Sequence, residues 1–264
     1  MKDFILLIPY FNNPEGIITS LKSVYYPTHK FEVLIVDDGS KIPLNTDILK
    51  IEIAGITFNI LRLPENVGVA KALNKGLDML HSRKDYKYIA RLDCGDSCSP
   101  NRFIEQVKCM DEHSEIGLLG TWCRFADSKS GKSYLYKTRT KHEDIIREMH
   151  FKCSFIHPTV MFRREILDTI GHYPENYPHA EDYAYFCRIL HKFRGYVLPQ
   201  NLVDIPISKN SVSYSNRKEQ ILTRKKIVSE MNDSIINKVL GLFYLEILSL
   251  LPISLVNRLK YLVK

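Results

Sequence analysis

Both of the common glycine-rich phosphate-binding fingerprints are missing from the 264-residue sequence. No G-x-G-x-x-G follows the first apolar run, at residues 4–8, and no G-x-x-x-x-G-K-[S/T] occurs. In these motifs glycines let the backbone approach a phosphate at the start of a helix. Their absence argues against a dinucleotide-dependent dehydrogenase and against a P-loop nucleotide hydrolase.

Paired cysteines are missing as well. The six cysteines are scattered, and none of them forms the C-x-x-C spacing of a zinc or redox site. We therefore expect reduced thiols, as in a cytosolic protein. A signal-peptide layout is also lacking, because the apolar run at residues 4–8 is short and ends at Pro9.

No apolar run reaches the roughly 20 residues that a membrane-spanning helix needs. The strongest run, residues 239–251, is interrupted by Gly241 and Glu246, and basic residues flank it. This pattern favours a helix that lies on an anionic membrane surface, so we predict a basic, amphipathic helical region over residues 213–264. A helix packed on the rest of the protein, or a contact between two copies in a homo-oligomer, is the alternative.

The net charge of +7 suits three kinds of partner: nucleic acid, an anionic membrane face or a phosphate-bearing substrate. The basic residues gather toward the C-terminus beside apolar segments and match no nucleic-acid-binding motif. We therefore expect no nucleic-acid partner.

Strand and helix patterns alternate through the first half of the chain. Apolar runs of strand length at residues 4–8, 31–36, 56–63, 88–92 and 116–121 alternate with helical patterns at 14–24, 69–80 and 101–113. A further strand is predicted at 132–137, with helices at 141–149, 163–170 and 181–193. The alternation predicts an α/β fold, in which helices flank a mostly parallel sheet.

Polar residues follow three of the predicted strands, at residues 9–12, 37–40 and 93–96. Ligands of such sheets bind beyond the carboxyl ends of the strands. We therefore expect these three segments to meet along one edge and to form a nucleotide-type crevice.

The third of these segments carries two carboxylates, Asp93 and Asp96, with Gly95 between them and Arg91 just before. Hard cations such as Mg²⁺ or Mn²⁺ take carboxylate oxygens and are often completed by substrate phosphates. The turn therefore predicts a site for a divalent cation and a diphosphate. A solvated Asp-Gly turn is the alternative reading.

A second pair of acids, Glu181 and Asp182, opens the helix predicted at 181–193. Acids are common in a first turn because the helix dipole favours them. The functional hypothesis is that one of the two is a general base beside the crevice.

Taken together, the motifs closely resemble the family 2 glycosyltransferases of GT-A fold, particularly bacterial enzymes of surface-polysaccharide synthesis. The resemblance covers roughly residues 3 to 200 and is carried, in order, by IPYFNN (8–13), VDDGS (36–40), NVGVAKALNKG (66–76), ARLD (90–93), HPT (157–159) and ED (181–182). It implies a GT-A domain over 1–212, with a nucleotide-sugar-binding half at 1–125 and an acceptor half at 126–212.

The resemblance also implies an activity: transfer of a sugar from a UDP-sugar, with inversion at the anomeric carbon. It implies uracil and ribose contacts at Pro9, Tyr10 and Asp38 with Asp37 beside them, nucleotide or diphosphate contacts at Asn66, Lys71, Arg91 and Asp93, and a catalytic base at Asp182 with Glu181 next to it. The implied acceptor is a glycan or a lipid-diphosphate-linked sugar in O-antigen or capsule synthesis, at the inner face of the plasma membrane.

One position departs from the family pattern. The family usually writes the acidic turn as Asp-x-Asp, and here the third position is Gly95. A Mn²⁺ or Mg²⁺ cofactor would then rely on Asp93 and Asp96. A metal-independent enzyme and an inactive nucleotide-sugar-binding protein are the alternatives that this departure leaves open, as is a transferase acting on lipid phosphate or on a soluble acceptor.

Three further side chains are candidates for the acceptor side. His157 lies in the HPT segment, His179 precedes Asp182 by three residues, and Trp122 follows a predicted strand. Trp122 could stack on an acceptor sugar, with core packing as the equal alternative.

Overall fold

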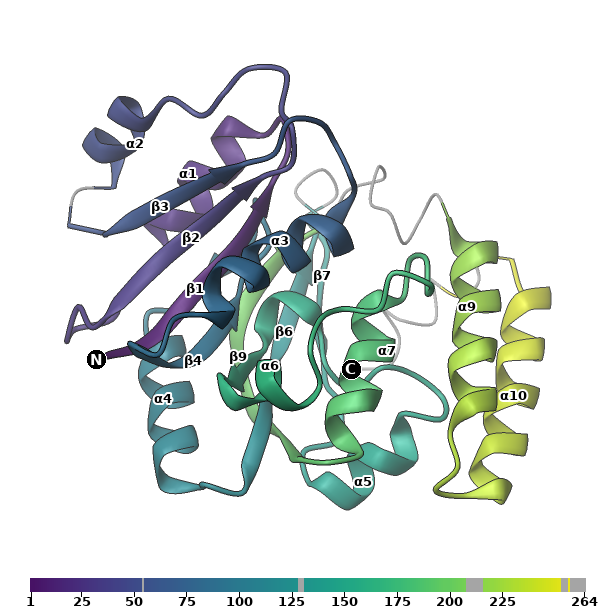
Figure 1. Cartoon of the computed structure of the whole chain (residues 1–264). Coiled ribbons are helices and arrows are strands. Elements are labelled where there is room, and N and C mark those ends of the chain that lie inside the picture. The colour runs from purple at the N-terminus through teal and green to yellow at the C-terminus, as the bar shows by residue number, and fades with distance from the viewer. Residues whose placement is uncertain (54, 128–130, 208–215, 253–255, 257–264) are drawn as a thin grey trace.

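The computed structural model describes residues 1–53, 55–127, 131–207, 216–252 and 256. Its strands are β1 (Lys2–Tyr10), β2 (Phe31–Asp37), β3 (Phe58–Arg62), β4 (Tyr86–Arg91), β5 (Ser97–Cys98), β6 (Ile116–Ala126), β7 (Ser133–Tyr136), β8 (Met161–Arg163) and β9 (Arg194–Pro206). The described strands form one nine-stranded sheet in the order β3-β2-β1-β4-β8-β6-β9-β5, with β7 beside β6 (Figure 1).

Four of the eight strand pairings in the described sheet are parallel, and they are the longest ones. The strand pairs β3–β2, β2–β1, β1–β4 and β6–β9 are parallel. The short strand β8 runs antiparallel between β4 and β6, and β5 and β7 are antiparallel additions to β9 and β6. The predicted α/β fold is therefore confirmed, and its sheet is mixed, with the parallel pairings holding most of the paired residues.

Helices cover both faces of the sheet (Figure 1). They are α1 (Pro14–Lys22), α2 (Thr46–Glu52), α3 (Val69–His81), α4 (Arg102–Glu112), α5 (His142–Glu148), α6 (Glu165–Thr169), α7 (Glu181–Leu190), α9 (Arg217–Glu230) and α10 (Ile235–Leu250), with a 3₁₀ turn, η1 (His157–Thr159). One apolar core lies between the sheet and α1, α2 and α4. The other lies on the opposite face, under α3, α5, α6 and α7.

Strand β1 shows why a continuous apolar run suits this position. Ile5 and Leu7 point into the core under α3, whereas Phe4, Leu6 and Ile8 point into the core under α1 and α4. All five side chains are fully buried. A strand with helices on both faces buries every residue, so its sequence shows no polar alternation.

The long strand β9 was not predicted, because Pro199 and the polar residues after it break the apolar pattern. The sheet accommodates them by a register shift: Thr121 pairs with Leu198, but Trp122 pairs with Asn201. Such a bulge leaves the extra residues outside the ladder, where a proline costs no hydrogen bond. The short elements α2 and β5 were also not predicted, and the helix expected to reach residue 193 ends at Leu190.

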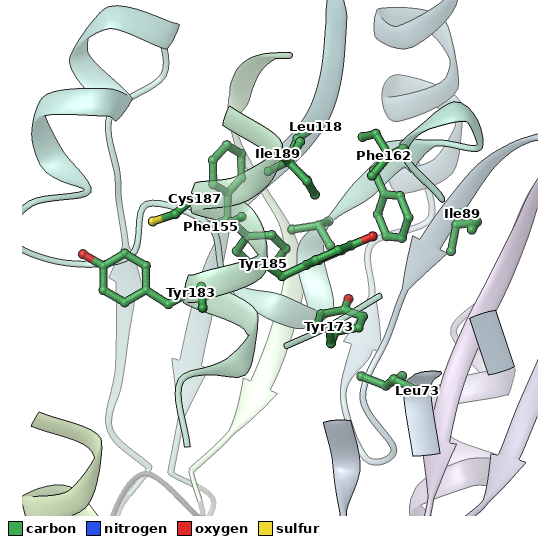
Figure 2. Packing of buried hydrophobic residues seen from close by; sticks show 14 of the residues in the cluster. Leu73, Ile89, Leu118, Phe155, Phe162, Tyr173, Tyr183, Tyr185, Cys187 and Ile189 are labelled. Carbon is green, nitrogen blue, oxygen red and sulfur yellow. The ribbon is translucent and has the colours of Figure 1, made fainter. Parts of the chain in front are cut away.

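An aromatic cluster lies beneath α7 (Figure 2). Tyr173 and Tyr185 pack with their ring centroids 4.3 Å apart, Phe162 contacts Tyr185, and Phe155 contacts Phe186 next to it. The hydroxyl of Tyr185 donates to the carbonyl oxygen of Gly171 at 3.0 Å. These contacts give the helix that carries Glu181 and Asp182 a rigid support.

The C-terminal region is helical, as predicted, and it is packed on the rest of the protein. Helices α9 and α10 lie side by side next to α7 (Figure 1). Gly241 of α10 lies so close to the backbone of His150 that a Cβ there would clash with the His150 carbonyl oxygen. None of the described helices is long and apolar enough to cross a bilayer. Of the amphipathic region predicted over residues 213–264, the structure describes residues 216–252 and 256, and the rest lies outside the described residues.

One prediction concerns an ion cluster at the amino end of the sheet. Glu32 is buried and accepts hydrogen bonds from Arg83 at 2.7 and 3.0 Å and from Asn59 at 2.8 Å, with Lys2 at 3.0 Å. The Arg83 hydrogen bonds lower the pKa of Glu32 to about 2, against the opposing effect of burial. We expect Glu32→Gln to lower the free energy of unfolding by roughly 3 kcal/mol at neutral pH.

Because the folded-state pKa is depressed, this stability is present above the unfolded pKa of about 4.3 and is lost as the pH falls toward 2. Urea unfolding at about pH 7 and about pH 3 therefore measures it, and the difference between wild type and variant should shrink at the lower pH. Asp47→Asn, at an exposed position of α2, is the matched control. An equal loss in both variants would contradict the assignment.

Candidate active site

The three polar segments expected to converge do meet at the carboxyl edge of the sheet. The backbone N–H of Asn12 donates to Ser40 Oγ at 2.9 Å, and the N–H of Lys41 donates to Asn12 Oδ1 at 2.9 Å. The third segment is tied to α1 by the N–H of Gly95, which donates to Ser20 Oγ at 2.8 Å. The loops after β1, β2 and β4 therefore form one wall.

The two acids after β2, Asp37 and Asp38, stabilise the loops of this wall by accepting backbone hydrogen bonds. Asp38 accepts hydrogen bonds from the N–H groups of Val67 at 2.8 Å and Gly68 at 3.0 Å, and thereby holds the loop that starts α3. Asp37 accepts from the N–H of Ser40 at 2.9 Å. Both carboxylates are buried. Their first role is therefore to shape the crevice, since both oxygens of Asp38 are already engaged with the α3 loop.

The other residues predicted on the nucleotide side differ in exposure. Burial, and then the charge of Asp37, raise the pKa of Tyr10, so this phenol lies inside the wall as a neutral group. Pro9 is partly exposed, whereas Asn66 and Lys71 are exposed beside the start of α3. Among the described side chains none pairs with Lys71, which leaves its ammonium available to an anionic ligand.

Asp93 is the carboxylate that the acidic turn presents to solvent. Its side chain is 41% exposed, and its Oδ1 accepts from Arg91 Nη2 at 2.7 Å. Arg91 is fully buried and also donates to the carbonyl oxygen of Leu7. Because the Arg91 side chain is fully buried, this structure does not support the predicted direct contact between Arg91 and a diphosphate. Arg91 instead lies beneath Asp93 and orients it.

Asp96, predicted as a second metal ligand, lies on the buried side of the turn, with 6% of its surface exposed. Burial, and then the charge of Asp93, raise the pKa of Asp96. Gly95 has φ of +107°, a backbone conformation that an aspartate adopts only with strain. This turn conformation therefore favours a glycine at position 95, where the family usually has an aspartate.

The donor set for a cation is consequently small. Across the described parts of the chain no three His, Cys, Asp or Glu side chains come together as a metal site. Of the two acids in the turn, Asp93 is the one that offers a carboxylate oxygen to the crevice. Mg²⁺ is commonly held by one or two carboxylates together with substrate phosphates, so Asp93 fits a cation that arrives with a diphosphate.

Glu181 and Asp182 open α7 on the other side of the crevice. Desolvation, followed by the charges of Glu181 and Asp93, raises the pKa of Asp182 to about 7. Burial likewise raises the pKa of Glu181, with Asp93 as a smaller contributor. The acidic turn therefore lies close enough to the start of α7 for the charge of Asp93 to contribute to the pKa of both acids.

Hydrogen bonds connect Arg91, which lies beneath the acidic turn, with His157 and Tyr173. His157 Nε2 accepts from the Tyr173 hydroxyl at 2.9 Å and faces Arg91 Nε at 3.4 Å. Burial, and then the charge of Arg91, hold the pKa of His157 well below its usual range, so its ring is neutral. His157 is thus an acceptor that orients Arg91, and through it Asp93.

Tyr173 is the site residue that sequence reasoning missed. Its backbone exchanges two 2.9 Å hydrogen bonds with the Asn74 side chain of α3. Burial raises the pKa of Tyr173, and the charges of Asp182 and Asp93 add to this effect. No sequence pattern distinguishes Tyr173 from the other fourteen tyrosines. Its place follows from tertiary packing, which Figure 2 shows around its ring.

The two remaining acceptor-side candidates point elsewhere. His179 Nε2 lies 3.1 Å from Glu219 Oε2 of α9. Trp122 donates from Nε1 to the carbonyl oxygen of Thr138 at 3.1 Å, and its ring packs against the core with Lys137 over it. For Trp122 the structure therefore shows the core-packing alternative.

The model of the family described as "Glycosyl transferase family 2" matches residues 5–171, which is more than half of the chain. The chain belongs to glycosyl transferase family 2. A curated relative, the amylovoran biosynthesis glycosyltransferase AmsE of Erwinia amylovora, is 30% identical over 193 residues, covering 71% of this chain and 69% of that protein. The Escherichia coli UDP-Gal:alpha-D-GlcNAc-diphosphoundecaprenol beta-1,3-galactosyltransferase is 25% identical over 202 residues, covering 76% and 72%.

The fold of this family 2 glycosyltransferase also matches solved structures. Staphylococcus aureus TarS 1–349 in complex with UDP superposes with a TM-score of 0.67 at 20% identity, over 93% of this chain and 71% of that one. At this identity the match shows the fold, which is the GT-A fold that the sequence motifs imply.

The hypothesis that Asp182 is the general base, together with its pKa, predicts how the rate of the transferase depends on pH. A carboxylate with a pKa of about 7 is a base only in its ionised form, so kcat should rise with pH and level off above about 7. Below that value each further pH unit should lower kcat about tenfold. Initial rates of UDP release in overlapping buffers measure this profile. A rate that does not change between about pH 5 and pH 8 would contradict it.

Proposed function

We propose that this glycosyltransferase transfers a sugar from a UDP-sugar, with inversion, to a lipid-diphosphate-linked sugar in surface-polysaccharide synthesis. The observation that carries the proposal is the series of contacts between Asp93 and the helix of Asp182: hydrogen bonds lead from Asp93 through Arg91 and His157 to Tyr173, whose ring packs against Tyr185 of α7. The charge of Asp93 also contributes to the raised pKa of Asp182. An inverting displacement needs both groups at once: one at the leaving diphosphate and one at the incoming hydroxyl.

The chemistry follows from the positions of these side chains. Asp182 accepts the proton of the acceptor hydroxyl. At the same time the hydroxyl oxygen bonds to the anomeric carbon, and the bond between that carbon and UDP breaks. Asp93 would hold Mn²⁺ or Mg²⁺ together with the diphosphate, and that cation would neutralise charge on the leaving UDP. Lys71, at the exposed start of α3, supplies a further cation on the nucleotide side.

The relative from Escherichia coli supports the acceptor class, because its name states a diphosphoundecaprenol-linked acceptor. The C-terminal helices support a location at the inner face of the plasma membrane. Residues 213–264 contain nine Lys and Arg against four Asp and Glu. One face of α10 exposes large apolar side chains, namely Ile235, Ile236, Val239, Leu240, Phe243, Tyr244, Ile247 and Leu250. We propose residues 1–212 as the catalytic domain and 213–264 as its membrane-surface region.

The test of the donor class is UDP release from UDP-glucose, UDP-galactose and UDP-N-acetylglucosamine, each with Mn²⁺, with Mg²⁺ and with EDTA. We expect slow hydrolysis of one donor that EDTA abolishes. Binding of UDP without any release would indicate that the acceptor is required, and lipid-linked sugars would be added next. No release and no UDP binding by calorimetry would refute the proposal and favour an inactive protein of the same fold.

A variant of α10 tests the membrane surface. Phe243 is exposed on the apolar face, and Phe243→Glu introduces a charge that an anionic interface excludes. We expect this variant to lose most of its co-sedimentation with phosphatidylglycerol-containing vesicles. Ile51→Glu is the matched control, because Ile51 is an equally apolar, exposed residue of α2. Equal binding by the Phe243 variant and wild type would exclude this face as the membrane contact.

A further inference from the structure

The segment before α7 depends on contacts from outside itself. It consists of residues 176–180 and leads directly into Asp182, two residues beyond Ala180. No side chain caps the N-terminus of α7 at Ala180. His179 has φ of +62°, a conformation that non-glycine residues adopt at a cost of order 1 kcal/mol. Such a conformation persists only where the surroundings determine it.

The first turn of α9 supplies one set of these contacts. Gln220 Nε2 donates to the carbonyl oxygen of His179 at 2.9 Å. The carboxylate of Glu219 lies 3.1 Å from His179 Nε2. Both ends of the strained residue, its carbonyl and its ring, are therefore held by neighbouring residues of one helix.

The later turns of α9 supply a second set. Lys226 Nζ donates to the carbonyl oxygen of Asn176 at 3.3 Å and lies 4.3 Å from the centre of the Tyr177 ring. The Tyr177 hydroxyl donates to Glu230. Helix α9 therefore contacts the segment at Asn176, at Tyr177 and at His179.

Helix α9 is in turn braced by α10 rather than by the segment that it holds. Arg217 donates to the carbonyl oxygens of Leu248 at 2.6 Å and Leu251 at 2.8 Å. Lys225 pairs with Glu246 of α10. Lys225 and Lys226 are thus adjacent residues of one helix, of which the first contacts α10 and the second contacts the segment before α7.

We propose that α9 is a positioning element for the general base: Gln220 and Lys226 fix residues 176–180, and so set where Asp182 stands relative to the crevice. This role rests on the proposed function of Asp182. It gives the C-terminal region a part in the reaction in addition to membrane binding, through residues that do not touch the substrate.

The adjacent lysines provide the experiment. Hydrolysis of UDP-galactose, or of whichever UDP-sugar in the panel the wild type cleaves, gives kcat and the donor KM. We expect Lys226→Met to lower kcat by about 10- to 100-fold, because small displacements of a catalytic group cost about that much, with the donor KM unchanged. Lys226→Arg keeps a cation and a donor and should recover most of the rate. Lys225→Met should stay close to wild type.

Gln220→Glu, which keeps the shape but cannot donate to His179, should behave like Lys226→Met. Hydrogen exchange of residues 176–182 provides a readout that needs no turnover. It should rise in Lys226→Met and Gln220→Glu but not in Lys225→Met. Unchanged exchange and unchanged kcat in folded Lys226→Met, or equal losses in both lysine variants, would overturn the positioning role. If the wild type shows no turnover, raised exchange in Lys226→Met but not in Lys225→Met would show that the proposed function fails while α9 still fixes residues 176–180.

Discussion

Asp182→Asn is expected to lower kcat about 10³-fold while UDP binding is retained. The amide has nearly the same shape as the carboxylate but cannot accept the proton of the acceptor hydroxyl. The side chain lies at the start of α7, away from the wall built by Asp37 and Asp38, so the affinity for UDP should not change. Calorimetry with UDP and initial-rate kinetics measure the two quantities separately.

Glu181→Gln is the control for this variant, since it removes a neighbouring charge from the same helix turn. Glu181 is the second-largest influence that raises the pKa of Asp182. Its removal should therefore move the acid limb of the pH profile to lower pH and leave the plateau rate largely intact. If Glu181→Gln lost activity as completely as Asp182→Asn, the roles of the two acids would have to be exchanged.

Asp93→Asn is expected to have the second-largest effect, a loss of about 10²- to 10³-fold in kcat/KM. Asp93 is the acid of the turn whose oxygens reach the crevice, and Arg91 fixes its direction. The variant should also lose any response to added Mn²⁺ or Mg²⁺. Titration of the rate against each cation, for wild type and variant, tests both statements.

Asp96→Asn is the matched control, three residues along the same turn. Asp96 is buried and its pKa is raised, so an uncharged amide should be tolerated with little change in rate. The two variants distinguish the sequence-based hypothesis from the structural one. A loss in Asp96→Asn as large as that in Asp93→Asn would restore Asp96 as a metal ligand.

The fold was largely predictable because its signals are local. The apolar run of β1 and the polar segments after three strands follow from burial on both faces and from parallel pairing. Their convergence at one edge is then a geometric consequence. Strand β9 was not predicted because Pro199 breaks its pattern, and its pairing with β6 and β5 makes it a strand.

The site was less predictable, because which way a side chain points is a tertiary property. Nothing near Arg91 in the sequence indicates that it is buried beneath Asp93. The burial of Asp96 depends on the positive φ of Gly95, and the contribution of Tyr173 depends on its bonds to Asn74, 99 residues away. Residue types and spacing placed the acids in the turn after β4 and at the start of α7, where the structure has them, but did not give their orientations.

The pairing of β8 with both β4 and β6 has a consequence for how the enzyme can be divided. Strand β8 belongs to the second half of the chain, yet it fills the gap between two strands of the first half. A cut near residue 125 would leave β4 with a bare edge and would strip β6 of β8 and β9. Residues 1–125 and 126–212 are therefore not exchangeable modules, and a hybrid with a related transferase would have to carry β6, β8 and β9 across together.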